Sequence, residues 1–345
     1  MSRTASSCLA VFCLTLLTLA GAAEPKRVAY FESGPFWLFS NTMLPLKTQL
    51  LEMEDFSVTF PEELHFSPGW DASPTVTEEI AANLMARDDV DLIIAAGTTV
   101  VRELLRQNNG RTPIIGIGMA DPLAAGVVES PDDSGIDNFT CLVVVDRWKQ
   151  MIRVFHDLVG FSTLGMIYPP GPEGRLYSAV DDAKEVAAEL GFQVLEQEIP
   201  DEYTPACSEG IKWLNEHGAD AIFIGPLICF DWELSDLTPL LDQINRLHKM
   251  PSFARDGSLF VQSGVLMGFA TWDFTLLGRR MVNMINLIFQ GEKARSLPMR
   301  INMEPLISIN LETAKEIGYD PPFDVLVAAD EIYTVSKKPA TAPDK

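Results

Sequence analysis

Short apolar runs recur along the chain, and segments with helical patterning separate them. The runs show little alternation and are rich in Ile, Val and Leu; they are Val28–Phe31, Leu92–Ala96, Ile114–Met119, Leu164–Tyr168, Ala221–Ile224 and Val265–Ala270. Runs of this kind are typical of parallel strands that helices cover on both faces. Their alternation with helices predicts open, doubly wound α/β sheets.

The segments between the runs carry helix-start and helix-end signals. Thr75 and Glu78 have the spacing of a capping box at the start of one helix. Ser178 and Asp181 have the same spacing before a second helix, which Gly191 is expected to end. The chain has more predicted strands than one sheet of ordinary size would contain, and the polar segment Pro131–Asn138 interrupts the alternation of strands and helices. We therefore expect two lobes, with a boundary at this segment.

The N-terminus has the pattern of a secretory signal peptide. Arg3 is the only charged residue before Glu24, and the thirteen-residue stretch Cys8–Ala20 lies between them. The small residues after this stretch suit cleavage before Glu24. The alternative is a buried N-terminal helix. No cysteine directly follows the small residues, so no lipid anchor is expected. Residues 1–23 are therefore predicted to be removed on export to the periplasm.

Cys141, Cys207 and Cys229 remain in the mature chain, and an odd number leaves at least one thiol unpaired within the chain. Cys207 and Cys229 could form a disulfide in an oxidising compartment. The sequence cannot place their Cα atoms, however, and isolated buried cysteines are the preferred interpretation. Their spacing matches no zinc pattern.

Composition and charge narrow the function. The chain has 345 residues, 47% of them hydrophobic, and a net charge of −22. This charge disfavours nucleic acid and anionic membranes as partners. The sequence contains no phosphate-binding glycine loop, dinucleotide fingerprint, nucleophile elbow or H-E-x-x-H motif. We therefore expect no cofactor, no metal and no catalysis.

In open α/β sheets, ligands bind beyond the carboxyl ends of the strands, so the residues that follow each run are candidates. They combine hydroxyls, carboxylates and aromatic rings, which suit a zwitterionic ligand with an apolar or aromatic side chain. Each has a structural alternative: Thr98 as a helix N-cap, Asp121 and Asp256 as turn residues, and the aromatic residues as core packing. Among the aromatic candidates are Phe36, Trp37 and Trp272.

Asp256 and Trp37 receive specific roles. Asp256 follows an apolar segment and precedes Gly257, so its carboxylate is expected to lie on a tight turn and to hold an ammonium group. Its alternative is a purely structural role in that turn. Trp37 is expected to form an apolar wall.

The stretch Val90–Val128 contains an apolar strand that ends in A-x-G-T, then a helix, then P-I-x-G-x-G-x-x-D-P-x-x-A-G-V. Further matches follow in order and are Asn138-Phe139-Thr140, Tyr168-Pro169-Pro170-Gly171, Pro251-Ser252-Phe253-Ala254, Leu277-Gly278-Arg279, Gly291-Glu292-Lys293 and Ile309–Ala314. This pattern closely resembles the ABC-transporter solute-binding family that includes tryptophan- and tyrosine-binding proteins. The resemblance covers nearly all of the mature chain.

The resemblance implies a type I periplasmic-binding-protein fold, with two α/β lobes, three hinge crossovers and a ligand clamped between them. We assign 24–138 and 262–293 to the first lobe and 139–261 and 294–339 to the second, in agreement with the family pattern, and we expect 340–345 to be a disordered tail. Loops at six positions would line the site; they are Ser33, Thr98, Asp121, Tyr168, Gly225 and Asp256.

The main hypothesis is a monomeric periplasmic protein that binds an amino acid or a similar solute and delivers it to a membrane permease. Two alternatives remain: a sensor subunit that reports its ligand to a membrane histidine kinase, and an enzyme that uses carboxylates of the site. Neighbouring genes distinguish transport from sensing, and turnover of a candidate ligand identifies an enzyme.

Overall fold

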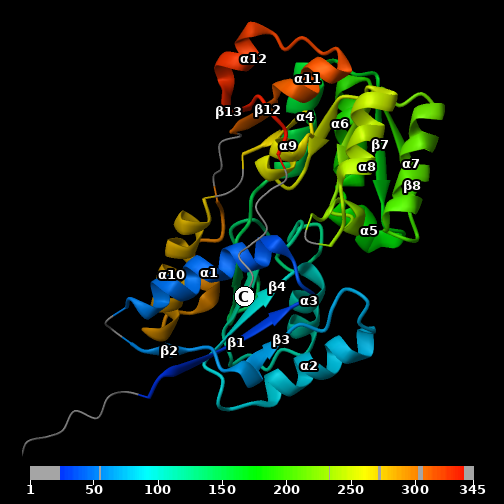
Figure 1. Cartoon of the computed structure of the whole chain (residues 1–345). Coiled ribbons are helices and arrows are strands. Elements are labelled where there is room, and N and C mark those ends of the chain that lie inside the picture. Colours follow the sequence, from blue (N-terminus) through cyan, green and yellow to red (C-terminus); the bar gives the residue numbers. More distant parts are fainter. Residues whose placement is uncertain (1–23, 54–55, 233, 271–272, 302–305, 338–345) are drawn as a thin grey trace, which may run out of the picture.

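The computed structural model describes residues 24–53, 56–232, 234–270, 273–301 and 306–337. These residues form two lobes, each built on one mostly parallel sheet (Figure 1). The predicted signal peptide and the predicted disordered tail lie outside the described residues. Within them, no helix combines the length and the apolar character needed to span a bilayer.

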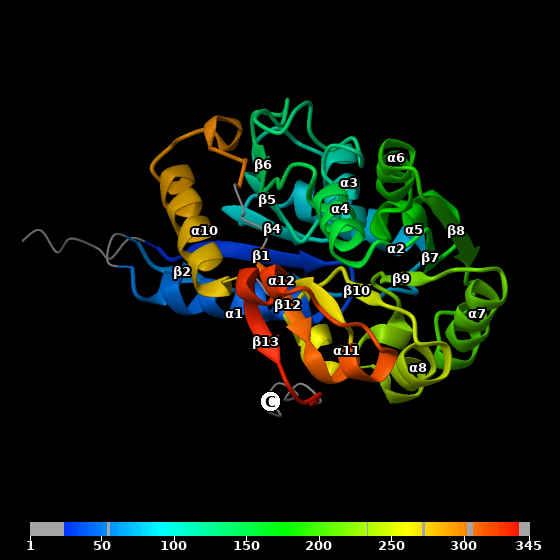
Figure 2. The same ribbon diagram turned by 90° about the horizontal axis from the view of Figure 1, so that it is seen from above.

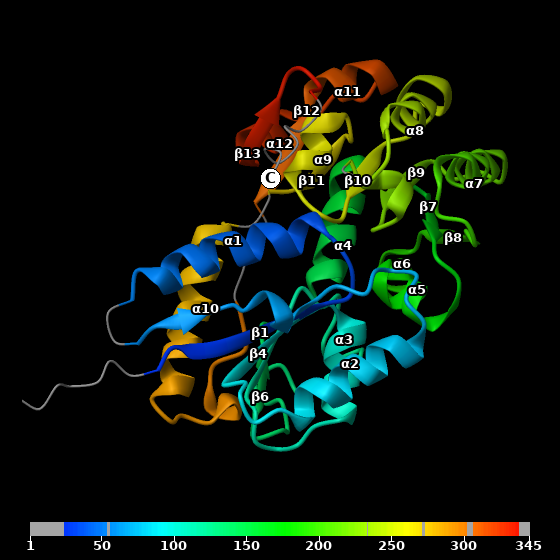
Figure 3. The same ribbon diagram turned by 60° about the horizontal axis from the view of Figure 1, so that its bottom comes forward.

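The first lobe has the strand order β2-β1-β4-β5-β6, with β3 also paired to β1, and every pairing is parallel. Its elements are β1 (Lys26–Glu32), α1 (Trp37–Leu51), β2 (Val58–Thr59), β3 (His65–Phe66), α2 (Pro74–Ala86), β4 (Leu92–Ala96), α3 (Thr98–Arg106), β5 (Ile114–Ile117), β6 (Phe139–Cys141) and α10 (Phe274–Phe289). Helices α1 and α10 lie side by side on one face, and α2 and α3 cover the other (Figure 3).

Both faces of this sheet are buried, which explains why its strands read as continuous apolar runs. Val28 and Tyr30 of β1 pack into the core beneath α1 and α10. Ala29 and Phe31, the alternating neighbours, pack into the core beneath α2 and α3. A strand covered on both faces has no solvent side that would require polar residues.

The second lobe has the strand order β13-β12-β11-β10-β9-β7-β8, in which β11 and β12 alone are antiparallel among the described pairings. Figure 2 shows β13 and β8 at opposite edges. Its elements are α4 (Arg147–Val159), β7 (Thr163–Tyr168), α5 (Gly171–Tyr177), α6 (Val180–Leu190), β8 (Gln193–Glu198), α7 (Thr204–Glu216), β9 (Ala221–Ile224), α8 (Thr238–Asp242), β10 (Ser252–Ala254), α9 (Ser258–Ser263), β11 (Met267–Phe269), β12 (Ile307–Asn310), α11 (Leu311–Ile317), α12 (Phe323–Ala328) and β13 (Ala329–Tyr333).

The predicted fold class is confirmed, but the predicted lobe boundaries are wrong by several residues. Strand β6 pairs with β5, so the first lobe continues through Cys141. Strand β11 pairs with β10, so 262–269 belongs to the second lobe. Ala294, Leu297 and Met299 pack into the cores of the first lobe, so that lobe continues to about residue 300. Strand pairing determines where each lobe begins and ends, and the positions of polar segments in the sequence do not reveal which strands pair.

The structure confirms the predicted helix end at Gly191 but shows neither of the two predicted capping boxes. Gly191 ends α6 in a left-handed conformation with φ 83°, as expected. The N-cap residues of α2 and α6 are instead Ser73 and Ala179, and neither helix start has a side-chain cap. Asp181 pairs with Arg175, at 2.5 Å, rather than capping α6.

Two glycines at strand ends let α1 approach the first sheet. Gly97 follows β4 with φ 99°, and Gly118 follows β5 with φ 60°. A Cβ at Gly97 would lie 2.5 Å from Ser33 Oγ, and one at Gly118 would overlap the ring of Phe39. Only glycine satisfies both the positive φ and the close approach.

We predict that Gly118→Ala lowers the free energy of unfolding by about 2–4 kcal/mol, because it adds overpacking to the cost of positive φ. Gly110→Ala is the matched control, since Gly110 has φ 71° with no atom within 4 Å of a built Cβ. It should cost about 1 kcal/mol. Urea denaturation of both variants measures the difference, and equal losses would contradict the packing role of Gly118.

Candidate functional site

A cavity of about 300 Å³ lies between the lobes, at the carboxyl ends of strands from both sheets. Its wall from the first lobe includes Ser33, Phe36, Trp37, Phe39, Trp70, Gly97, Thr98, Thr99, Gly118 and Ala120. Its wall from the second lobe includes Pro169, Glu173, Tyr177, Glu202, Gly225, Ile228, Phe230, Asp231, Arg255, Asp256 and Phe260.

Six of the nine predicted ligand-binding residues line this cavity; they are Ser33, Phe36, Trp37, Thr98, Gly225 and Asp256. Asp121 and Tyr168 are not part of its wall, and Trp272 lies outside the described residues. The rule that ligands bind beyond the carboxyl ends of the strands (the strand-end rule) therefore locates the cavity, although it does not determine which way each side chain points.

Asp121 and Tyr168 have structural partners instead. Asp121 Oδ1 accepts hydrogen bonds from the backbone N–H groups of Leu123 and Ala124, both at 2.9 Å, so it caps its own turn. Tyr168 is buried in the core of the second lobe, and Arg175 Nη1 donates to its hydroxyl at 3.1 Å. The structural alternative, a turn residue in one case and core packing in the other, describes both side chains.

The wall from the first lobe is built from tight strand-to-helix turns. Ser33 N–H donates to the Ala96 carbonyl at 3.0 Å, which holds the loops after β1 and β4 together. Thr98 is buried at the start of α3, and its Oγ1 accepts from Ala120 N–H at 3.3 Å. Thr98 therefore joins the loops after β4 and β5 instead of capping its own helix.

Aromatic rings form much of the remaining wall. Trp37 is only 2% exposed and packs against Trp232, with ring centroids 5.1 Å apart, and edge-on against Phe274 at 6.2 Å. Although α1 belongs to the first lobe, Trp37 is part of an apolar core of the second lobe. Phe36 packs edge-on against both Trp37 and Phe39, with ring centroids 5.8 Å and 5.2 Å apart. Trp37 thus serves both as cavity wall and as packing between the lobes.

Polar contacts also cross between the lobes. Trp148 Nε1 on α4 donates to the Ala120 carbonyl at 2.9 Å. The hydroxyls of Thr99 and Tyr177 lie 2.9 Å apart, and Arg102 on α3 forms an ion pair with Glu173 on α5. The lobes are therefore in direct contact along the rim of the cavity.

A charged cluster at the end of β10 was only partly predicted. Asp256 is flanked by Arg255, whose Nε donates to Asp256 Oδ1 at 2.9 Å, and their side chains are 8% and 7% exposed. Burial lowers the pKa of Arg147 to about 9, with the charge of Arg255 acting in the same direction and that of Asp256 opposing it. The strand-end rule would also have found Arg255, because it directly follows the strand.

Glu202 is a second residue that sequence reasoning missed. It follows β8, an edge strand whose polar sequence QVLEQE gave no apolar run. Burial raises the pKa of Glu202, while its hydrogen bond from Ile228 N–H, at 3.3 Å, acts in the opposite direction. This hydrogen bond connects the loops after β8 and β9.

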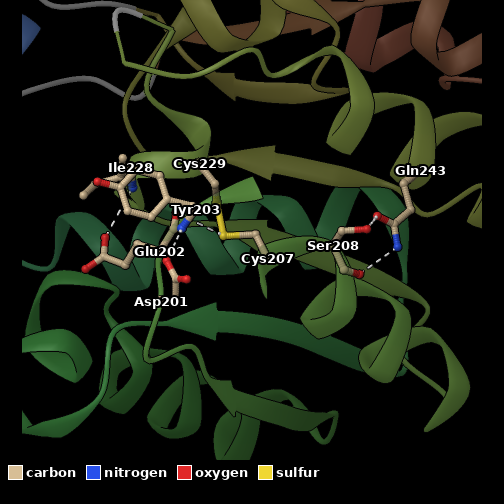
Figure 4. Close-up of a disulfide and its surroundings, with 8 residues drawn as sticks. All are labelled: Asp201, Glu202, Tyr203, Cys207, Ser208, Ile228, Cys229 and Gln243. Carbon is tan, nitrogen blue, oxygen red and sulfur yellow. Dashed lines mark hydrogen bonds between the residues drawn. A yellow bond between two sulfur atoms is a disulfide. The ribbon is translucent and has the colours of Figure 1, made fainter. Parts of the chain in front are cut away.

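A disulfide between Cys207 and Cys229 fixes the same region, contrary to the preferred interpretation of isolated thiols. Figure 4 shows that it links α7 to the loop after β9. This loop contains Ile228 and Phe230 of the cavity wall. Cys141 is buried and free.

Within the described residues, no group of His, Cys, Asp and Glu side chains has the arrangement of a metal site. The site therefore consists of an apolar, largely aromatic cavity with hydroxyls on one wall and a buried ion pair on the other.

The chain belongs to the family of ABC transporter substrate binding proteins, whose family model matches residues 70–333. The same fold occurs in a Streptococcus pneumonia ABC domain in complex with L-Trp, with 19% identity, a TM-score of 0.70, and coverage of 88% of this chain and 99% of that one. A conserved domain protein from Vibrio cholerae has 18% identity, a TM-score of 0.72, and coverage of 90% and 100%.

A substrate binding protein with adhesive properties from Clostridium difficile, in a ligand-free, open structure, has 21% identity, a TM-score of 0.61, and coverage of 90% and 100%. No curated protein matches the chain. These solved structures share the fold, and the family defines the chain as a solute-binding protein of the ABC transporter type.

We predict that replacing both disulfide cysteines, in Cys207→Ala/Cys229→Ala, lowers the free energy of unfolding by about 3 kcal/mol, because the disulfide closes a loop with a sequence separation of 22. Thermal unfolding with and without a phosphine reductant measures the effect. Reductant should lower the Tm of the wild type and leave that of the double variant unchanged. An unchanged wild-type Tm would contradict the prediction.

Proposed function

We propose that this protein is the extracytoplasmic solute-binding subunit of an ABC importer, which clamps a small solute with an aromatic or apolar body between its lobes. The observation that carries the proposal is the cavity at the carboxyl ends of both sheets, with walls from both lobes. Ligands of open α/β sheets bind at this edge, and domain closure sequesters them.

The size and lining of the cavity support a small ligand. About 300 Å³ is at the lower end of the range for small-molecule sites. Phe36, Trp37, Phe39, Phe230 and Phe260 offer rings to an apolar body. An amino acid with an aromatic or branched side chain fits this combination of volume and chemistry.

Two observations support a location outside the cytoplasm. The disulfide is typical of an oxidising compartment. Arg3, the uncharged stretch and the small residues before Glu24 have the pattern of a signal peptide. A protein that carries solute in that compartment requires a membrane permease as its partner, and we propose that it acts as a monomer.

Export is tested by N-terminal sequencing of the protein from the cell envelope. The mature chain should begin near Glu24, because the small residues before it suit signal peptidase. Recovery of the chain with Met1 intact from the cytoplasm would contradict this.

Ligand binding is tested by a thermal-shift screen of amino acids followed by small-angle scattering. Ligand at 100 times its Kd should add about 2.7 kcal/mol of stability, since it binds only the folded state. The radius of gyration should fall with the same ligand. A ligand that stabilises without reducing the radius would contradict closure, and a screen without a stabilising amino acid would contradict that ligand class.

Arg102→Gln sharpens the closure test. Its ion pair with Glu173 joins the lobes, and both side chains are more than 40% exposed, so its loss should weaken binding only about two- to five-fold. Arg106→Gln is the control on the same helix, because its partners Glu78 and Glu103 lie in its own lobe. Equal effects of the two variants on affinity would argue against closure through this contact.

A further inference from the structure

Three polar atoms of the cavity wall are buried and have no hydrogen-bond partner among the described residues. Two are donors, Trp37 Nε1 and Arg255 Nη1, and the third is an acceptor, Glu173 Oε2. Native proteins rarely leave buried polar groups unpaired, because an unmade hydrogen bond costs free energy. A ligand that supplies both a donor and acceptors therefore suits this wall better than one that supplies acceptors alone.

Glu173 lies where the two lobes meet. It is on α5 of the second lobe, and its Oε1 forms the ion pair with Arg102 on α3 of the first lobe. Both side chains are partly exposed, so water screens the attraction between them. One oxygen of the carboxylate thus binds the neighbouring lobe, and the other, in the cavity wall, lacks a donor.

The Tyr177 hydroxyl is the competing donor within the wall. Tyr177 lies one turn after Glu173 on α5, and its hydroxyl is 2.9 Å from Thr99 Oγ1. Burial raises the pKa of Tyr177, the hydrogen bond with Thr99 opposes this, and a weaker interaction with Glu173 adds to it. A hydroxyl has a single proton, so Thr99 is the principal partner. Glu173 Oε2 is left without a hydrogen bond of ordinary geometry.

The other carboxylates of the wall are less suited to a donor on the ligand. Asp256 accepts from Arg255 Nε at 2.9 Å, and the two side chains form a buried, neutral pair. Asp231 also has a partner. Burial raises the pKa of Glu202, which favours its neutral form. Within the described part of the wall, Glu173 is the carboxylate whose buried oxygen has no partner.

We propose, on the basis of the solute-binding function above, that Glu173 Oε2 accepts a hydrogen bond from an ammonium group of the ligand. A charged donor is the strongest partner for a carboxylate. Glu173, rather than Asp256, then holds this group, and through Arg102 the same carboxylate joins the ligand to both lobes. The ligand class is small amines with an aromatic or apolar body, and amino acids in this class also carry acceptors for the two buried donors.

L-Tryptophan and indole-3-propionate test this by calorimetry, because indole-3-propionate has the same ring and carboxylate but lacks the ammonium group. L-Tryptophan should bind the wild type at least about ten-fold more tightly, since a charged hydrogen bond is gained. Equal affinities, or tighter binding of indole-3-propionate, would overturn the proposal.

The ratio of these two affinities separates a contact with the ligand from a contact between the lobes. Arg102→Gln removes only the ion pair and should weaken both compounds alike, so the ratio should stay at or above that of the wild type. Arg102→Gln/Glu173→Met also removes the carboxylate, and the ratio should fall to about two-fold or less. A folded double variant that keeps the wild-type ratio would overturn the proposal.

Two further variants serve as controls, and circular dichroism establishes that each protein is folded. Tyr177→Phe removes the competing hydroxyl and should keep the ratio; a ratio as low as that of Arg102→Gln/Glu173→Met would assign the contact to the hydroxyl and overturn the proposal. Arg153→Gln/Glu189→Met removes a comparably exposed ion pair, joined at 2.6 Å within the second lobe, and should bind both compounds as the wild type does. An equal fall of the ratio in this control would also overturn the proposal.

Methylammonium separates the ammonium site from the aromatic ligand class. At constant ionic strength, replacing sodium by methylammonium should raise the Tm of the wild type more than that of Arg102→Gln/Glu173→Met. If neither indole compound binds but this difference is present, the aromatic part of the proposed function fails and the Glu173 site stands. If methylammonium acts equally on both proteins and L-tryptophan does not bind, the Glu173 site is refuted.

Discussion

The direction of the strands is the constraint on which the site depends. Every pairing in the first sheet is parallel, and so is every described pairing in the second except that of β11 with β12. Parallel strands bring their carboxyl ends to one edge, so loops that are distant in the chain, such as those at Ser33 and Asp256, face one cavity. Gly97 and Gly118 then let the first helix pack closely enough to add its aromatic residues to the wall.

The position of Trp37 couples the arrangement of the lobes to the shape of the cavity. This side chain lies on α1 of the first lobe, packs in a core of the second, and also borders the cavity. Trp148 makes the reverse connection, from α4 of the second lobe to the Ala120 carbonyl of the first. Any opening of the lobes must separate these contacts, so the aromatic wall is complete only when the lobes are together. Binding and closure are therefore expected to be one event.

The sequence allowed the central strands to be predicted well, because they are buried on both faces. Leu92–Ala96 and Ala221–Ile224 match β4 and β9 residue for residue. The edge strands β8 and β13 were missed, since their partly exposed positions carry Gln, Asp and Glu. Likewise, choosing candidates among the residues that follow the strands identified six cavity residues, but it also included Asp121 and Tyr168. The side chains of these two residues bind partners in their own lobe instead. Side-chain direction and charge pairing are tertiary properties, and no local pattern encodes them.

The role first expected of Asp256 shows how a tertiary partner changes the chemistry of a residue. An isolated buried carboxylate would require a cation from the ligand, but Arg255 already supplies one at 2.9 Å. The chain as a whole has a net charge of −22, which by itself would favour a cationic ligand. Surface charges, however, are screened over about 8 Å at physiological ionic strength, whereas buried groups are screened much less. The buried pair of Arg255 and Asp256 in the cavity wall is therefore screened less than the acidic surface, whose charge disfavours large anionic partners.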